Sequence, residues 1–232
     1  MDLGGEIVNK VVLGLSGGMD SSTLTGFYIS CGYEVIGVSF EYGSKHNKYE
    51  NKAAEEIAKF YNIELKKISL PFIGEQFDSN LLKTGGEIPE GHYQQENMSL
   101  TVVPGRNVIF ASIMMGLAWS LRAEIIGLGV HIGDHAIYGD CRPGFVAAMN
   151  AAIIQASDGK VRIEAPFQYC DKNEILKIGY NLNPQVPYEY TRTCYKDQLF
   201  SCGRCGSCSE RLEAFKKIGI KDPLTYEGDK ND

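Results

Sequence analysis

The stretch Leu15-Ser16-Gly17-Gly18-Met19-Asp20-Ser21-Ser22 follows the apolar run Val11-Val12-Leu13 and opens an amphipathic segment. A strand that ends in such a turn leaves backbone N–H groups unpaired at a helix start, where the helix dipole favours an anion. The glycines let the backbone approach that anion closely, and the serines add hydroxyl donors. Asp20 suits either a helix cap or a Mg²⁺ that arrives with phosphates. The stretch therefore predicts a phosphate site between a strand and a helix.

The two commonest nucleotide loops are absent from the sequence, because neither Gly-x-x-x-x-Gly-Lys-Ser/Thr nor Gly-x-Gly-x-x-Gly occurs at this strand. Ser-Gly-Gly-Met-Asp-Ser instead resembles the signature of the PP-loop ATP pyrophosphatases, whose loop binds the departing pyrophosphate of ATP. The alternative is a tight turn without a ligand. By this resemblance we expect ATP to be bound by Leu15, Ser16, Gly17, Gly18, Met19, Asp20, Ser21, Ser22, Thr23, Leu24, Thr25, Phe40 and Arg106, with Ser16, Asp20 and Arg106 acting in catalysis.

Strand patterns alternate with helix patterns along most of the chain, which predicts right-handed βαβ units and a doubly wound parallel sheet. The strand patterns cover 11–15, 34–40, 65–70, 124–130 and 162–165. The helix patterns cover 20–31, 49–61, 108–121, 144–155, 172–180 and 209–218. The expected fold class is α/β and Rossmann-like, similar to the adenine nucleotide alpha hydrolases, with a C-terminal zinc-binding segment.

Ligands of such sheets bind at the carboxyl ends of the strands. This rule places the Ser16 loop, Tyr42, His131 and Asp134 along one edge. Residues 80–101 show no sustained period, which is typical of a functional loop, a lid or a disordered segment. We expect an ATP-binding domain over residues 1–190 and a cysteine-containing segment with a helix over residues 191–232.

The net charge and the lengths of the apolar runs exclude some classes of function. The net charge of −6 disfavours a nucleic-acid surface, so we expect small-molecule substrates and no direct nucleic-acid partner. The first nine residues lack a basic segment followed by an apolar core, and no apolar run approaches the roughly 20 residues that span a bilayer. A cytoplasmic protein without membrane contact is therefore expected. The sequence leaves the oligomeric state open, a homodimer included.

Four of the seven cysteines gather within fifteen positions near the C-terminus: Cys194, Cys202, Cys205 and Cys208. Four thiolates suit tetrahedral Zn²⁺, and a site filled entirely by protein ligands is structural. An iron–sulfur cluster and a chance group of reduced thiols are the alternatives, although ferredoxin cysteines are spaced differently. We expect structural zinc that takes no part in bond making.

A larger set of motifs resembles one family, the 7-cyano-7-deazaguanine synthases of the PP-loop superfamily. The resemblance spans almost the whole chain. Its parts are Ser16-Gly17-Gly18-Met19-Asp20-Ser21, Pro104-Gly105-Arg106-Asn107, Gly129-Val130-His131, Asp140-Cys141-Arg142, Ala165-Pro166, Thr193-Cys194-Tyr195 and the last three clustered cysteines.

This resemblance implies an ATP-dependent carbon–nitrogen ligase of 7-deazaguanine (queuosine-type) biosynthesis. ATP, accompanied by Mg²⁺, activates the carboxylate of 7-carboxy-7-deazaguanine, ammonia attacks, and the resulting amide is activated and dehydrated to the nitrile. Adenylation turns a carboxylate oxygen into a leaving group, so no protein nucleophile is required. The resemblance and the motif positions together suggest substrate contacts from His131, Asp134, Tyr138, Asp140, Arg142 and Phe145.

Two glycines depart from the family pattern, Gly139 and Gly144. They leave open a relative that transfers the activated acyl group to another amine, including a protein amine. A PP-loop enzyme that modifies transfer RNA is a further alternative, disfavoured by the acidic composition.

Overall fold

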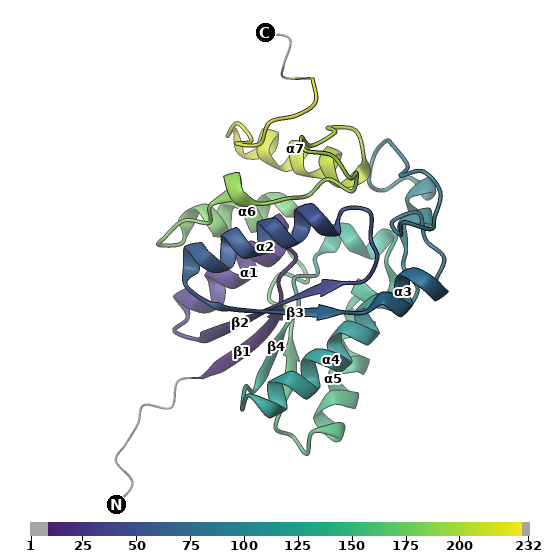
Figure 1. Ribbon diagram of the computed structural model, residues 1–232. Helices are drawn as coiled ribbons and strands as arrows, with labels where there is room; N and C mark the ends of the chain where they lie inside the picture. Colours follow the sequence, from purple (N-terminus) through teal and green to yellow (C-terminus); the bar gives the residue numbers. More distant parts are fainter. Residues whose placement is uncertain (1–8, 229–232) are drawn as a thin grey trace, which may run out of the picture.

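The computed structural model describes residues 9–228. The expectation of no leader segment concerns residues 1–9, of which 1–8 lie outside the described residues, as do 229–232. The described chain forms one sheet of five parallel strands in the order β3-β2-β1-β4-β5 (Figure 1). The strands are β1 (Lys10–Gly14), β2 (Glu34–Glu41), β3 (Glu64–Ser69), β4 (Ile125–Gly127) and β5 (Arg162–Glu164). The expected doubly wound α/β fold is confirmed.

Helices cover both faces of this sheet (Figure 1). One face carries α1 (Met19–Ser30), α2 (Asn47–Tyr61) and α6 (Lys172–Asn181), and the other carries α4 (Arg106–Ser120) and α5 (Pro143–Ala156). Alternate residues of β1 serve the two layers: Val11 and Leu13 pack with α1 and α2, whereas Val12 packs with α4 and α5. Both layers are apolar, which explains why this central strand is a continuous hydrophobic run.

Strand β4 ends earlier than expected, at Gly127 instead of Val130. Its neighbour β1 pairs with it only as far as Leu13, opposite Gly127, and then turns into the Ser16 loop. Beyond that point the chain after β4 no longer pairs with β1, while the Leu128 N–H still donates to the carbonyl of Glu164. The same departure of β1 opens the carboxyl edge of the sheet above the loop.

The segment without period, residues 80–101, is held in place by specific contacts. The Lys45 amine donates hydrogen bonds to the carbonyls of Asn80, Gly85 and Gly86. Short helices that the sequence did not predict flank or end several loops: α3 (Pro71–Gln76), η1 (Glu96–Thr101), η2 (Ile132–Ala136), η3 (Gly139–Cys141) and η4 (Tyr188–Tyr190).

Helix α7 (Gly206–Ile218) packs against α6 beyond the carboxyl edge of the sheet (Figure 1). Arg211 of α7 is fully buried and forms a two-pronged ion pair with Asp222, which fixes the chain after the helix. Within residues 9–228, no helix combines the length and apolar character needed to cross a membrane.

Candidate active site

The loop between β1 and α1 is shaped by Gly17 and Ser16. Gly17 has φ +75°, and a Cβ there would lie 2.5 Å from the Ala53 Cβ and from the Ala54 nitrogen of α2. Ser16 Oγ accepts a hydrogen bond from the Gly18 N–H at 3.2 Å and lies 3.1 Å from Ser21 Oγ. Gly18 caps α1 without a side-chain bond, so N–H groups of the first helical turn remain suited to an anion.

A cavity of about 290 Å³ lies against this loop at the carboxyl edge of the sheet. Eight of the thirteen residues expected to bind ATP line it: Leu15, Ser16, Gly18, Met19, Asp20, Ser21, Phe40 and Arg106. The other five support the loop from behind. Gly17 packs on α2, Thr23 Oγ1 lies 2.9 Å from the Tyr188 hydroxyl, Thr25 bonds the carbonyl of Ser21, and Ser22 and Leu24 are fully buried.

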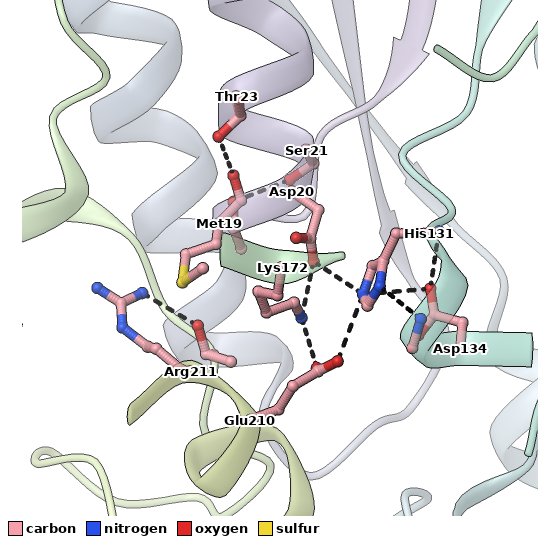
Figure 2. A network of polar contacts seen from close by, with 12 residues as sticks. Met19, Asp20, Ser21, Thr23, His131, Asp134, Lys172, Glu210 and Arg211 are labelled. Atoms are coloured by element: carbon pink, nitrogen blue, oxygen red, sulfur yellow. Dashed lines mark hydrogen bonds and ion pairs between the residues drawn. The ribbon is translucent and has the colours of Figure 1, made fainter. Parts of the chain in front are cut away.

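Asp20 lies in a network of charged side chains drawn from four segments of the chain (Figure 2). Its Oδ2 is 3.1 Å from the Lys172 amine, which is also 2.7 Å from Oε2 of Glu210. The His131 Nε2 lies 3.5 Å from Asp134, 3.8 Å from Asp20 and 3.9 Å from Glu210. The other oxygen of Asp20, Oδ1, is buried and has no hydrogen-bond partner. An unsatisfied carboxylate oxygen in this place suits a cation or a donor delivered by a ligand.

Two members of the network, Asp20 and Lys172, keep their charges at neutral pH. Burial alone raises the pKa of Asp20, but Lys172 and His131 outweigh it and hold the pKa below its ordinary value. Burial alone lowers the pKa of Lys172, which is only 8% exposed. The carboxylates of Asp20 and Glu210 reverse that effect and raise the pKa of the amine. A carboxylate and an ammonium therefore face each other beside the loop.

Arg106 provides a second cation on the cavity wall, at the first residue of α4. Its guanidinium donates to the Tyr42 hydroxyl at 3.4 Å and lies 5.9 Å from the centre of that ring. Within residues 9–228, no carboxylate pairs with it. Aromatic side chains line the same part of the cavity, where Phe40 and Phe110 stack at 3.9 Å between ring centres. A charged group without a protein counterion in an aromatic pocket suits a planar anionic ligand.

The residues expected to contact the substrate are divided by the structure. Asp134 and Tyr138 line the cavity, and His131 lies directly behind as the buried centre of the charged network. Three others lie off the wall. Asp140 accepts a hydrogen bond from the Asn107 N–H and so binds the start of α4, and Arg142 donates to the carbonyl of His135. Phe145 is partly buried and packs against the core. The substrate roles of these six residues remain predictions.

Cys141 lines the cavity as well. Burial raises the pKa of its thiol well above the usual range, so it stays protonated at neutral pH. This protonation agrees with a chemistry that requires no protein nucleophile.

Two residues of the charged network were absent from the sequence-based site, Lys172 and Glu210. Lys172 is the first residue of a helix with a capping box between Asp171 and Glu174, and it resembled an ordinary first-turn residue. Only their positions in the chain point to the site. Lys172 begins the helix pattern after the last strand, and Glu210 follows the last clustered cysteine by two residues.

The four clustered cysteines come together in a buried group, with all four sulfur atoms within 4.8 Å of one another. The Cys202 and Cys208 sulfurs are 3.9 Å apart, close to the spacing of two thiolates around one tetrahedral ion with bonds of about 2.3 Å. Backbone N–H groups of Cys202, Arg204 and Cys205 point at sulfur atoms at 3.3–3.4 Å, which stabilises thiolates. The donor set fits a structural four-cysteine metal site.

Known proteins match this chain over almost its whole length. The family model for the queuosine biosynthesis protein QueC matches residues 10–219. A 7-cyano-7-deazaguanine synthase from Caldicellulosiruptor saccharolyticus is 44% identical over 218 residues, which cover 94% of this chain and 96% of that protein. The enzyme of the same name from Hahella chejuensis is 45% identical over 221 residues, covering 95% and 94%.

Solved structures with a similar fold are more distant in sequence. NMN synthetase from Francisella tularensis superposes with a TM-score of 0.53 at 16% identity, covering 93% of this chain and 79% of that one. A predicted subunit of tRNA methyltransferase from Methanocaldococcus jannaschii gives 0.50 at 14% identity, covering 96% and 94%. At such identities the likeness concerns the fold alone.

The parallel sheet and the Ser-Gly-Gly-Met-Asp-Ser loop at its carboxyl edge define a Rossmann-like α/β protein of the PP-loop class. Within that class, the chain belongs to the family of the queuosine biosynthesis protein QueC. The family resemblance predicted from the motifs is thereby confirmed.

Proposed function

We propose that the protein is an ATP-dependent ligase that converts 7-carboxy-7-deazaguanine and ammonia to 7-cyano-7-deazaguanine. Family membership and the printed names of the relatives support this proposal. The observation that carries it is the single cavity in which the Ser16 loop and the uncompensated Arg106 face the same space. One end of that cavity suits phosphates and the other a planar carboxylate.

At the phosphate end, we assign Ser16 and Asp20 to the triphosphate of ATP. The N–H groups of the first turn of α1 and the Ser16 hydroxyl stabilise the charge that develops on departing pyrophosphate. The unpartnered Oδ1 of Asp20 is the atom suited to Mg²⁺ bound with ATP. When bound, Mg²⁺ would neutralise part of the phosphate charge.

At the other end, we assign Arg106 to the carboxylate of the deazaguanine, or to the adenylate formed from it. Tyr138 also lines the cavity, and Asp134 lines it beside the charged network of Asp20 and His131. The carboxylate oxygen attacks the α-phosphorus of ATP and pyrophosphate leaves. Ammonia then displaces AMP, which gives the amide and one proton. The amide oxygen then attacks the α-phosphorus of a second ATP, and a second pyrophosphate leaves. The oxygen departs with AMP and the nitrogen loses two protons, which leaves the nitrile. In each step the protein binds and orients reactants and needs no covalent intermediate of its own.

We also propose Zn²⁺ as the occupant of the four-cysteine site. Bound zinc would supply cross-linking of the C-terminal segment, since four thiolates leave no position for a reactive water. Its ligands would be Cys194, Cys202, Cys205 and Cys208, and the described part of the segment 191–232 is what it would order.

The test is incubation of the protein with ATP, ammonium and 7-carboxy-7-deazaguanine, with products read by mass spectrometry. We expect the nitrile, with AMP and pyrophosphate formed at two per nitrile. Asp20→Asn should lower pyrophosphate release at least 100-fold, roughly the loss of a charge-assisted phosphate or metal contact. Asp158→Asn, at an exposed residue past the end of α5, is the matched control.

Failure of the intact protein to form the nitrile or the amide would refute the proposed reaction. A conjugate of the deazaguanine with a protein amine would instead favour the acyl-transfer alternative. Full pyrophosphate release by Asp20→Asn would remove Asp20 from the phosphate site while leaving the reaction itself standing.

A further inference from the structure

The helix that follows the cysteine cluster reaches into the proposed nucleotide site. Cys208 lies in the first turn of α7, and Glu210 follows it by two residues. Ser207 and Glu210 lie three residues apart on one face of α7, and both line the cavity. A segment ordered by the cysteine site therefore provides part of the wall beside the Ser16 loop.

Glu210 meets this loop through one lysine. Its Oε2 is 2.7 Å from the Lys172 amine, and the same amine is 3.1 Å from Asp20 Oδ2 (Figure 2). The side chain of Lys172 is long and has four rotatable bonds. Without Glu210, its amine could turn toward Asp20 alone. The carboxylates of α1 and α7 hold it from two sides.

The charges explain why this placement matters for an anionic ligand. Asp20, Asp134 and Glu210 bring three carboxylates to the phosphate end, and Lys172 is the cation paired with two of them. His131 stands between the same three carboxylates. An approaching triphosphate is repelled by the carboxylates and attracted by the amine, whose position along the cavity therefore controls the local potential.

We propose that Glu210 is a positioning residue of the ATP-dependent step: it holds Lys172 at the cavity wall where the amine meets the phosphates. The cysteine site thus serves catalysis indirectly, by fixing the start of α7 and with it Glu210. This inference rests on the proposed function, because it assumes that ATP occupies the cavity.

A double-mutant cycle tests whether Glu210 acts through Lys172. The four proteins are the wild type, Glu210→Gln, Lys172→Met and the double variant, compared by kcat/KM for ATP in pyrophosphate release. Glu210→Gln alone should lower this constant by roughly ten- to a hundredfold, the value of one hydrogen bond to a charged group. In the Lys172→Met background the same change should cost less than about twofold, because the lysine through which Glu210 is proposed to act is absent.

If the Lys172→Met protein is too slow to assay, ATP binding is measured by isothermal titration calorimetry. Glu210→Gln should then raise the dissociation constant of ATP in the wild-type background and change it little in the Lys172→Met background. Glu210→Asp, which keeps the charge but shortens the side chain, should fall between the wild type and Glu210→Gln. Glu213→Gln is the matched control on α7, since that carboxylate faces His92 and is partly exposed. Metal content should match the wild type in all variants, and each variant should remain folded at the assay temperature.

Equal losses from Glu210→Gln in both backgrounds, or no loss in the wild-type background, would overturn the inference. A Glu210→Gln protein that lacks its metal would overturn it too, because the effect would then be structural. A wild-type protein that neither binds ATP nor releases pyrophosphate would refute the proposed function instead, so the two failures are separable.

Discussion

At the scale of single residues, Gly17 shows how the loop depends on space as well as on backbone freedom. Its positive φ disfavours any side chain, and the space where a Cβ would stand is filled by the Ala53 side chain and the backbone of α2. Gly159 has the same φ of +75° but nothing within 4 Å of a Cβ built on it. A side chain at Gly159 would therefore meet backbone strain alone, whereas a side chain at Gly17 would meet the same strain and a steric clash.

We expect Gly17→Ala to lower the free energy of unfolding by about 3 kcal/mol, the sum of left-handed strain and overpacking. Gly159→Ala should cost about 1 kcal/mol, from strain alone. Urea unfolding of both variants measures the difference. Pyrophosphate release should fall only in Gly17→Ala, because the clash moves the loop. Equal costs at the two positions would contradict the assigned clash.

The loop was predictable from the sequence because its signal is local: glycines, hydroxyls and an acidic residue stand between one strand pattern and one helix pattern. The neighbours Lys172 and Glu210 were not predictable in the same way. Each acquires its role only when α6 and α7 pack near the start of α1, and no local pattern distinguishes a lysine at a helix start that faces solvent from one that faces a carboxylate. The substrate contacts depend on the same long-range packing, so they remain predictions.

At the scale of elements, the sequence predicted the alternation of strands and helices but not where pairing stops. The apolar strand pattern runs to Val130, yet β4 ends at Gly127 because β1 has already turned away. Element ends of this kind depend on the neighbouring strand. The division into residues 1–190 and 191–232 likewise stays a prediction, although the cysteine cluster gives it a physical basis.

The cysteine cluster joins three segments: Cys194 before α7, the turn at Cys202 and Cys205, and the loop around Glu90, which bridges to Cys205. Cys205→Ser should release the metal and lower the unfolding free energy by about 3 kcal/mol, hence the melting temperature by roughly 10 °C. Limited proteolysis should then cut within 191–228. Cys31→Ser, at an exposed thiol, is the control and should change neither property.

Elemental analysis should find one zinc per chain in the wild-type protein and in Cys31→Ser. Iron in place of zinc, or freshly purified protein without any metal, would refute the assignment of the ion. Cys205→Ser protein that keeps its metal and resists protease would refute the assignment of the ligands.

At the scale of the whole molecule, the ion pair between Asp20 and Lys172 links α1 to α6 and should appear in the pH dependence of stability. The pKa of Asp20 lies below its ordinary value of 3.8 in the folded chain, so its contribution is present above that pH and is lost as pH falls through the folded value. The pKa of Lys172 lies above 10.5, so its contribution is complete below pH 10.5 and is lost at higher pH.

Lys172→Met should therefore lower the free energy of unfolding by about 2 kcal/mol, the value of hydrogen bonds to a charged group, at every pH between 5 and 9. As pH falls from 3.8 through the lower folded pKa of Asp20, the difference from the wild type should shrink, because Asp20 becomes protonated in both chains and no longer needs a cation. Urea unfolding of both proteins between pH 2 and 9 measures this difference in the free energy of unfolding. Loss of metal in acid affects both proteins alike and cancels in the difference. A gap that stays constant down to pH 2 would show that Lys172 stabilises the fold by packing and not by its charge.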